Sequence, residues 1–489
     1  MMYLGGLDLG TTGCKISVYD TEGNYVSNYY CEYPSKRDSS GHEIDCALIL
    51  QSVKEVLKKA AGEYKLEALG VTSFGETFAM LDENDNILYP GLLYTDHRGD
   101  EQGREFAKKF GEDKLTYITG VKMHSMYGLA KMLWLKENEP QIFSKVKHVL
   151  QMTDFICYCL TGNAVIDYSL ASRSQCFDIR NKCWSDEILN MAGIDKAILS
   201  TPVKTGTVAG EIKKSICDEL GIEGGIKIVC GCQDQVAAAV GCGILKSGNA
   251  VDGTGTVECI TPVFDKVPEN EQIYEDRYSV VPYAVDGTYV CYAVSYTGGA
   301  AIKWFRDNVS AEKSYKELDK RVKSEPSGIL VMPHFAGSGN PYMDIYSKAA
   351  FIGLTLEHDY IDIYKAIMEG VTYDMLVNLE GLEKAGIVPE KLYATGGGAA
   401  SDVWLQIKAD ILNRQICTLK AKEAGACGIC MIAGTAIGLY KDLEEAKKIF
   451  VKEDKVFSPR PDMANKYAKL YNAYSKLYTA LTPVREAMI

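Results

Sequence analysis

Hydrophobic and polar positions alternate in short runs at the start of the chain. This alternation predicts strands near Tyr3–Asp8, Cys14–Asp20 and Tyr25–Tyr33. Apolar residues then recur at helical spacing over Cys46–Gly62, and the apolar run Leu66–Thr72 predicts a buried strand. A strand meander followed by a helix and a further strand is typical of an α/β protein.

The second half of the chain shows a similar order. Ala250–Val263 repeats the strand–turn–strand pattern, and Tyr393–Thr395 predicts a later buried strand. Helical spacing predicts three further helices, at Tyr360–Ala385, at Asp402–Asn413 and, as the last element, at about Ala464–Leu481. We therefore expect an α/β fold with a duplicated core.

The composition restricts the class of protein. A chain of 489 residues has room for two domains, which we expect at residues 1–246 and 247–489. The net charge of −12 argues against a nucleic-acid or anionic-membrane binder, because both need basic surfaces. The first residues have no signal-peptide pattern, and the 16 cysteines lie scattered among apolar residues, as is typical of reduced thiols. We expect a cytoplasmic protein.

Two glycine–threonine turns, one in each half, are the strongest chemical signal. Thr11 and Thr12 lie in the first turn, between Asp8 and Lys15. The second turn, Asp252–Thr256, contains Gly253 and Thr254. Such turns expose backbone N–H groups and hydroxyls to an anion, and two of them suggest two lobes that hold one polyphosphate. The alternative is an ordinary hairpin turn. The P-loop and dinucleotide motifs are both absent from the sequence.

Two longer segments point to a family. Met126–Asn138 and the stretch from Ala349 to Glu369 fit the two signatures of the FGGY carbohydrate kinases, with Gly128 in place of the usual Pro, Ser or Thr. The chain resembles this family from Leu4 to about Tyr440. The resemblance implies a two-lobed actin-like ATPase fold with a duplicated ribonuclease H-like core, and lobes that close over sugar and ATP.

Asp234 is the predicted catalytic residue. It lies just past a strand at the start of a helix, where the helix dipole favours a carboxylate, although a simple N-cap would also explain it. The resemblance implies that it acts as general base, accepting a proton from the sugar hydroxyl that attacks ATP.

The resemblance also implies the other site residues. Asp8 is expected to hold Mg²⁺, mostly through water. The residues expected to bind the ATP phosphates are Thr11, Thr12, Lys15, Gly253 and Thr254. Those expected to bind the rest of the nucleotide are Gly298, Gly397, Gly398, Ala399 and Ser401. Those expected to bind the sugar are Gly75, Glu76, Asp96 and Asp234. For Glu76, an ordinary exposed side chain is an equal alternative.

These expectations define an ATP-dependent kinase that phosphorylates a primary hydroxyl of a small sugar. A pentulose such as xylulose is the first expectation, and a glycerol- or erythritol-type polyol or another ketose is the alternative. From another class, an actin-like ATP-driven switch is the rival. The expected partners are ATP, Mg²⁺ and the sugar, with no nucleic acid or membrane; a homodimer stays open.

Overall fold

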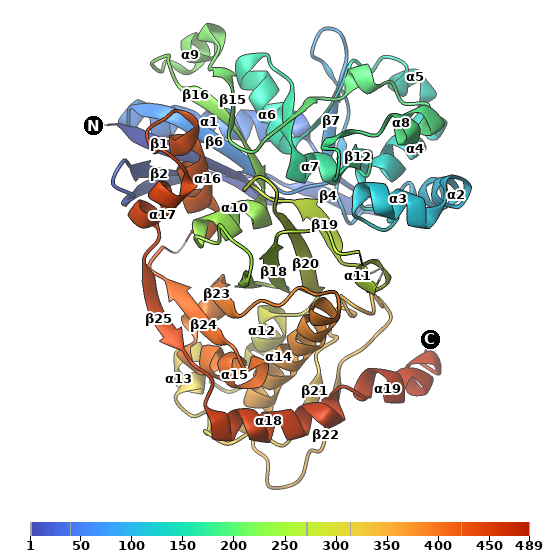
Figure 1. The fold of residues 1–489 in the computed structure, drawn as a ribbon, viewed down its shortest axis with the longest axis vertical. Coiled ribbons are helices and arrows are strands. Elements are labelled where there is room, and N and C mark those ends of the chain that lie inside the picture. Colours follow the sequence, from blue (N-terminus) through green and yellow to red (C-terminus); the bar gives the residue numbers. More distant parts are fainter. Residues whose placement is uncertain (1, 40, 270–271, 313, 422, 489) are drawn as a thin grey trace. The chain divides into compact units, whose positions relative to one another are not determined.

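The structure is a computed structural model that describes residues 2–39, 41–269, 272–312, 314–421 and 423–488. The chain forms two compact units. Unit 1 contains the chain up to Leu245 together with Ser279–Tyr289 and Glu423–Val451, and unit 2 contains the remaining residues. In Figure 1 the red helices of the segment 423–451 lie beside the blue strands at the start of the chain. A late part of the sequence thus completes unit 1.

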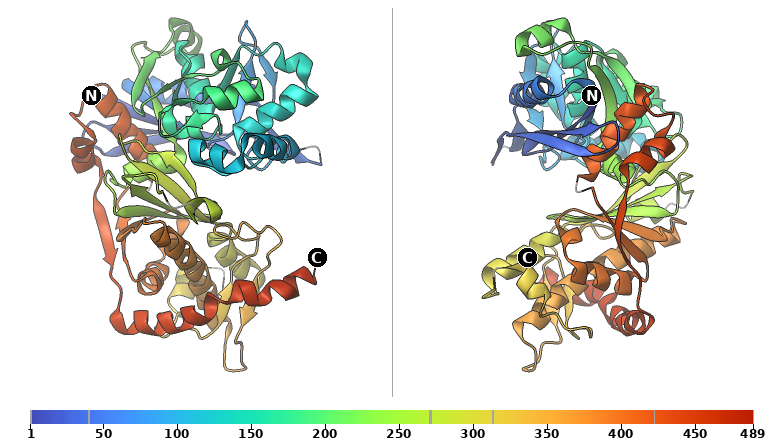
Figure 2. Two further views of the ribbon diagram at one scale, coloured as in Figure 1. Left: turned by 45° about the vertical axis from the view of Figure 1, so that its right-hand side comes forward. Right: turned by 90° about the vertical axis from the view of Figure 1, so that its left-hand side faces the viewer.

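A mixed sheet forms the centre of unit 1. Its strands, in spatial order, are β15 (Thr207–Glu211), β16 (Lys227–Gln233), β6 (Leu66–Ser73), β1 (Tyr3–Leu9), β2 (Gly13–Asp20) and β3 (Tyr25–Glu32). β1 pairs antiparallel with β2 and parallel with β6, and β6 pairs parallel with β16. Helices cover both faces of this sheet (Figures 1 and 2).

The helices of unit 1 follow the chain in the order α1 (Cys46–Glu63), α2 (Asp100–Phe110), α3 (Glu112–Thr119), α4 (Gly128–Asn138), α5 (Pro140–Phe143), α6 (Met152–Thr161), α7 (Tyr168–Ser172), α8 (Asp186–Ala192), α9 (Lys214–Leu220), α10 (Asp234–Gly241), α16 (Ala424–Ala436) and α17 (Leu443–Phe450). Its shorter strands are β4 (Ser35–Asp38), β5 (Gly41–Ile44), β7 (Phe78–Leu81), β8 (Ile87–Tyr89), β9 (Gly91–Leu92), β10 (His148–Gln151), β11 (Val165–Asp167), β12 (Phe177–Asp178), β13 (Cys183–Trp184), β14 (Thr201–Val203) and β19 (Ser279–Pro282).

A row of glycines allows α16 to pack closely on the sheet of unit 1. Gly6 and Gly70 are register partners on β1 and β6, and Gly231 lies on the neighbouring strand β16. A Cβ at Gly6 would lie 2.7 Å from the carbonyl oxygen of Ala426, and one at Gly70 would lie 2.8 Å from that of Ile429. Larger residues would push the helix off the sheet, because backbone atoms cannot yield as side chains can.

Unit 2 repeats the topology of unit 1. Its central strands are β20 (Tyr289–Ser295), β18 (Glu258–Phe264), β17 (Asn249–Thr254), β23 (Lys391–Thr395), β24 (Gln415–Leu419) and β25 (Glu453–Phe457). β17 pairs antiparallel with β18 and parallel with β23, and β23 pairs parallel with β24, just as β1, β2, β6 and β16 do. This repetition confirms the predicted duplicated α/β core.

The other elements of unit 2 are β21 (Leu330–Met332), β22 (Ala350–Ile352), α11 (Gln272–Glu275), α12 (Gly299–Asn308), α13 (Tyr315–Asp319), α14 (Tyr360–Lys384), α15 (Asp402–Leu412), α18 (Pro461–Tyr474) and α19 (Leu477–Glu486). The predicted single helix over Ala464–Leu481 is wrong, because α18 ends at Tyr474 and a second helix begins at Leu477. Neither glycine nor proline marks this break and the helical spacing of apolar residues continues across it, so the sequence gives no signal for the end of α18. Instead Pro483 lies inside α19.

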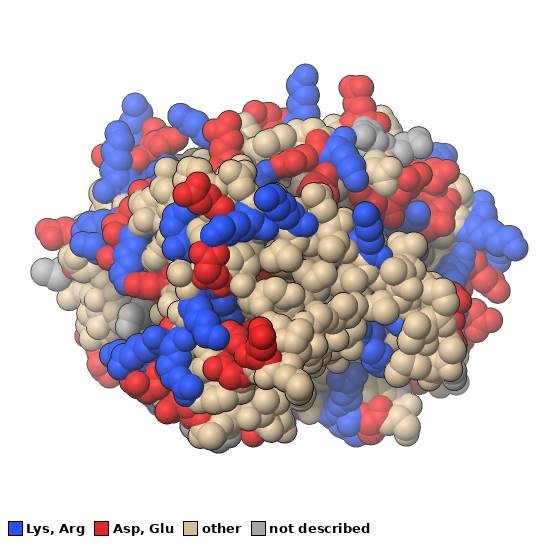
Figure 3. Space-filling model, turned by 90° about the horizontal axis from the view of Figure 1, so that it is seen from below, with Lys and Arg blue, Asp and Glu red and all other residues tan. Residues whose placement is uncertain are grey.

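The surface carries charges of both signs. On the face seen in Figure 3, basic and acidic side chains are interspersed around an uncharged area, so neither sign forms a continuous field there. Among the described helices, none is both long and apolar enough to cross a membrane.

Candidate active site

Asp234 is the first residue of α10, directly after β16 in unit 1. The N-cap of this helix is Gln233, whose side chain accepts the backbone N–H of Gln235 at 3.0 Å. The Asp234 carboxylate also accepts that N–H, at 2.6 Å. Because the neighbouring residue serves as the cap, capping alone does not account for the carboxylate of Asp234.

Several charged groups act on Asp234. Burial, and after it the negative charges of Asp8 and Glu76, raise the pKa of Asp234 to about 7, although the backbone N–H of Gln235 and the positive charge of Arg173 lower it. The pKa of Asp8 is itself raised by burial, against the attraction of Lys15. The fold therefore brings the predicted residues Asp8, Glu76 and Asp234 into one electrostatic neighbourhood within unit 1. A carboxylate with a pKa near neutrality is suited to accept and release a proton.

Glu76 is buried and forms an ion pair with Arg173, a residue that no sequence motif indicated. Glu76 is 5% exposed and has a left-handed backbone, with φ of 70°. Nε of Arg173 donates to Oε1 of Glu76 at 2.5 Å, and the guanidinium also lies 5.0 Å from the ring centre of Tyr127. The pairing joins residues 97 positions apart, so no local pattern could reveal it.

Gly75 leaves space that Arg173 partly fills. A Cβ at Gly75 would lie 3.1 Å from Cγ of Arg173, which is tighter than ordinary van der Waals contact. A larger residue at position 75 would therefore compete with the arginine that holds Glu76.

The carboxylate of Asp96 is engaged by its own loop and by β5. Oδ1 accepts from the backbone N–H of Arg98 at 2.9 Å, and Oδ2 accepts from Nη2 of Arg98 at 2.7 Å and from the backbone N–H of His42 at 2.7 Å. These bonds outweigh the burial of Asp96 and lower its pKa. The buried Lys131 donates to the Asp96 carbonyl oxygen at 3.1 Å. A sugar hydroxyl at Asp96 would share oxygens that already hold the loop together.

A second set of hydrogen bonds fixes the backbone next to Asp234. The Gln233 N–H donates to Ser169 Oγ at 3.0 Å, and the Ser169 hydroxyl donates to Asp167 at 3.0 Å. Asp167 also caps α7, the helix that precedes Arg173, and accepts a hydrogen bond from Thr205. One buried aspartate thus supports both the start of α10 and the helix that presents the arginine partner of Glu76.

The first glycine–threonine turn joins β1 to β2. Thr11 is half-buried, Thr12 is exposed, and Lys15 forms an ion pair with Glu423 at 2.5 Å. Nucleotide phosphate would compete with Glu423 for this ammonium. No group of three His, Cys, Asp or Glu side chains suited to a metal occurs in the described part of the chain. A single carboxylate such as that of Asp8 is enough for a Mg²⁺ ion that keeps most of its water and binds together with phosphates.

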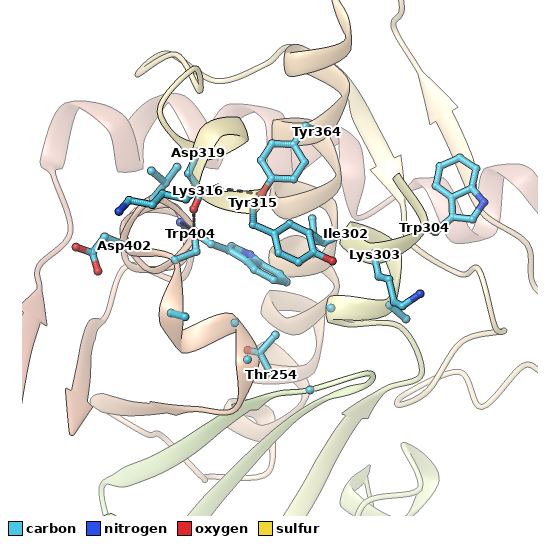
Figure 4. A pocket seen from close by; sticks show the side chains of 18 of the residues that line it. Thr254, Ile302, Lys303, Trp304, Tyr315, Lys316, Asp319, Tyr364, Asp402 and Trp404 are labelled. Atoms are coloured by element: carbon cyan, nitrogen blue, oxygen red, sulfur yellow. Dashed lines mark hydrogen bonds between the residues drawn. The ribbon is translucent and has the colours of Figure 1, made fainter. Parts of the chain in front are cut away.

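Unit 2 contains a cavity of about 1090 Å³. Thr254, Gly397, Gly398 and Ser401, all predicted for the nucleotide, line it. Figure 4 shows the aromatic side chains of Tyr315, Tyr364 and Trp404 grouped above Thr254. The cavity is large enough for a nucleotide, and aromatic walls next to a polar turn suit a molecule with a flat base and a charged tail.

Glycines bring the backbone walls of this cavity together. A Cβ at Gly398 would lie 2.6 Å from the side chain of Thr254, and one at Gly298 would lie 2.7 Å from the backbone of Val257. Gly253 and Ala399 adjoin residues that line the cavity, and Gly298 adjoins Gly299, which also lines it. The predicted glycines thus let residues 396–398, the triple-glycine segment, approach the second turn and the start of α12.

A hydrogen-bonded carboxylate borders the same cavity. Asp319 accepts from the hydroxyl of Tyr364 at 2.9 Å and from that of Ser401 at 2.8 Å. These bonds tie α13 to α14 and to the N-cap of α15, as the dashed lines in Figure 4 show in part. Ser401 therefore has a structural partner besides its predicted ligand.

Comparison with known families identifies the family of the chain. The N-terminal domain of the FGGY family of carbohydrate kinases matches residues 2–241, and the C-terminal domain of that family matches residues 264–437. The chain belongs to the FGGY family of carbohydrate kinases. It is therefore a phosphotransferase with an alcohol acceptor, and its fold is the actin-like two-domain fold of that family.

Individual relatives act on different substrates. The chain is 27% identical to a xylulose kinase of Lactococcus lactis, over 96% of this chain and 95% of the relative. It is 30% identical to a glycerol kinase of Thermococcus gammatolerans, over 96% of both chains. A ligand-bound xylulose kinase from Lactobacillus acidophilus superposes with a TM-score of 0.92 at 25% identity and covers all of both chains. This FGGY kinase thus resembles enzymes for a ketose and for a polyol over its full length.

Proposed function

We propose that this FGGY kinase transfers the γ-phosphate of ATP to a primary hydroxyl of a small ketose, with Asp234 as general base. The position of Asp234 carries the proposal. It begins α10 beside Asp8, Glu76 and Arg173, and its pKa is raised by burial to about 7. At neutral pH a large fraction of the Asp234 side chain is ionised, and the carboxylate readily accepts a proton because its conjugate acid is weak.

The proposed reaction balances around one proton. The acceptor oxygen attacks the γ-phosphorus as its O–H bond breaks and the proton passes to the Asp234 carboxylate. The bond from phosphorus to the β,γ-bridging oxygen breaks, and ADP leaves with that electron pair. Such transfer depends mainly on alignment and charge neutralisation, so a modest base in the right place is sufficient.

ATP is proposed to bind with its base and ribose in the cavity of unit 2. Thr254 and the backbone of the second turn would contact its phosphates, and Gly397 and Gly398 would lie against the nucleoside. In unit 1, Thr11, Thr12 and Lys15 would contribute further phosphate contacts. Mg²⁺ would neutralise phosphate charge, with Asp8 as its carboxylate partner.

A pentulose such as xylulose is the proposed acceptor. Its support is the full-length similarity to xylulose kinases, together with a buried Glu76 oriented by Arg173. An oriented carboxylate accepts two hydroxyl hydrogen bonds, which suits a chain of adjacent hydroxyls. Asp96 stays a predicted contact of a sugar hydroxyl.

A polyol is the second candidate. The greater identity to a glycerol kinase favours it, and so does Glu76, which a small triol would also contact. The two candidates differ in length and in the presence of a carbonyl group, so acceptor comparisons separate them.

An acceptor screen tests the proposal. The purified protein is given ATP and Mg²⁺ with pentuloses, hexuloses, aldonates or C3–C4 polyols, and ADP release is measured. We expect the largest kcat/KM for a pentulose. A larger value for glycerol or erythritol would establish the second candidate instead, and no acceptor-dependent ADP release from any of them would refute both.

A further inference from the structure

A lysine that neither the sequence motifs nor the proposed reaction uses lies beneath the second phosphate turn. Lys408 is on α15 and is 1% exposed. Its Nζ lies 2.6 Å from Oδ2 of Asp252, 2.6 Å from Oγ1 of Thr254 and 2.8 Å from Oε1 of Glu258. All these residues belong to unit 2. A single ammonium group therefore connects α15 to both strands of the hairpin that carries the turn.

The contact with Thr254 limits the directions in which its hydroxyl hydrogen can point. An ammonium group can only donate, so Lys408 occupies a lone pair of Oγ1. The hydroxyl hydrogen of Thr254 is then directed away from Lys408. Because Thr254 borders the cavity of unit 2, this arrangement makes it available as a hydrogen-bond donor to an anionic ligand there.

Each of the two carboxylates next to Lys408 has one oxygen that the ammonium group does not engage. Oδ1 of Asp252 and Oε2 of Glu258 are buried and have no hydrogen-bond partner in the described part of the chain. Burial, and then the adjacent charge of Asp252, raise the pKa of Glu258 to about 8 despite the attraction of Lys408. One proton between the two orphan oxygens would satisfy both. The group would then be neutral as a whole, with one ammonium and one carboxylate, and would not repel phosphate.

Neighbouring contacts connect this group to the cavity wall. Lys408 lies one helical turn after Trp404, with its Nζ 5.2 Å from the indole centre. Trp404 lines the cavity, and the absence of a side chain at Gly398 lets the triple-glycine segment rest on Thr254. A displacement of Lys408 would therefore reach the turn and the aromatic wall together.

We infer that Lys408 is a positioning residue for the nucleotide phosphates, and that it acts by holding the Thr254 hydroxyl as a donor toward them. This inference rests on the proposed binding of ATP in unit 2. It adds a specific consequence: Lys408 matters for the phosphate part of a nucleotide and not for the nucleoside part.

The test compares ligands that differ only in phosphate. Binding of ADP and of adenosine to the full-length protein is measured by calorimetry for wild type, Lys408→Met and Thr254→Val. We expect Lys408→Met to weaken ADP binding by about tenfold, the value of one hydrogen bond to a charged group, while adenosine binding is unchanged. In the Thr254→Val background, Lys408→Met should have no further effect on the ratio of the two affinities.

Lys365 offers a matched control. It is another buried lysine of unit 2, 2% exposed, on α14, and it donates to the carbonyl oxygen of Lys323 at 2.7 Å. Lys365→Met should lower thermal stability without changing the ratio of ADP to adenosine affinity. If Lys408→Met does not fold, the double variant Lys408→Met/Asp252→Asn is used in its place in the same comparison. Its second substitution removes the negative charge that the loss of Lys408 leaves without a partner.

The outcomes separate the two proposals. If wild-type protein binds neither ligand, the proposed nucleotide site fails. If wild type binds both ligands, the positioning role is refuted when Lys408→Met weakens the binding of ADP and of adenosine equally. It is also refuted when Lys408→Met weakens the binding of neither ligand. Additive effects of Lys408→Met and Thr254→Val on the affinity ratio would also refute it, because Lys408 would then act by another route.

Discussion

Ser169 Oγ accepts the backbone N–H of Gln233 at 3.0 Å, and Gln233 directly precedes Asp234. The hydroxyl of Ser169 in turn donates to the buried Asp167. The proposed catalytic carboxylate therefore begins its helix at a point fixed by a side chain from another part of unit 1. Small errors in that point are costly, because phosphoryl transfer needs an aligned hydroxyl.

Replacing Ser169 by Ala should lower kcat by roughly tenfold and change the sugar KM little, since the buried N–H of Gln233 loses its acceptor and Asp234 loses its fixed position. Steady-state kinetics check this. Ser172→Ala is the matched control, because Ser172 is on the same helix but donates to the Tyr168 carbonyl. Equal effects of the two variants would contradict a positioning role for Ser169.

Replacing Asp234 by Asn should lower kcat by several orders of magnitude while ADP affinity stays close to that of wild type. The rate falls because an amide cannot take the proton from the sugar hydroxyl. ADP affinity stays the same because the proposed nucleotide cavity is in unit 2 and Asp234 is in unit 1. Single-turnover assays and calorimetry measure the two quantities. Turnover near the wild-type value would place the base elsewhere.

The same substitution should raise stability at high pH. The folded-state pKa of Asp234, about 7, lies above the ordinary aspartate pKa of 3.8, so ionisation between these two pH values costs the folded state free energy. Asn carries no charge to repel Asp8 and Glu76. Thermal melting should show Asp234→Asn more stable than wild type at pH 8 and similar to it at pH 4. A difference that is the same at both pH values would exclude this explanation.

The pH dependence of kcat/KM should follow Asp234. The base is active when deprotonated, so the rate should rise with pH up to about 7 and then level off, within the range where other groups do not titrate. Glu76→Gln removes a negative charge that raises this pKa, and the midpoint should move to lower pH. A pH–rate profile of each protein measures the midpoints. An upward or absent shift would count against the assignment.

Replacing Arg173 by Met should destabilise the protein by roughly 3–5 kcal/mol, because Glu76 becomes a buried charge without a partner. Both side chains of this pair are nearly buried, at 6% and 7% exposed. The double variant with Glu76→Gln removes the stranded charge and should recover most of that loss. Urea unfolding compares the two variants. Equal stability of the single and double variants would show that the charge of Glu76 is not what matters.

The local pattern of the chain determined the elements that carry both turns. The strands on either side of Thr11 and the start of the helix at Asp234 follow from alternation and spacing, which act within a few residues. The predicted bounds of β1, β2, β3 and α1 differ from those of the structure by a single residue at an end. The duplicated core followed from the same signals, because each copy uses the same short-range order of strands and helices.

Only the tertiary structure decided which side chains meet. Arg173 reaches Glu76, Ser169 reaches Gln233, and the 423–451 segment returns to the first sheet because glycines leave room for α16. Lys408 looks like a misplaced charge on an apolar helix face until Asp252 and Glu258 are seen beside it. Burial of a charge is tolerated only where a partner compensates for it, and that partner is chosen by packing between distant segments, which no local periodicity encodes.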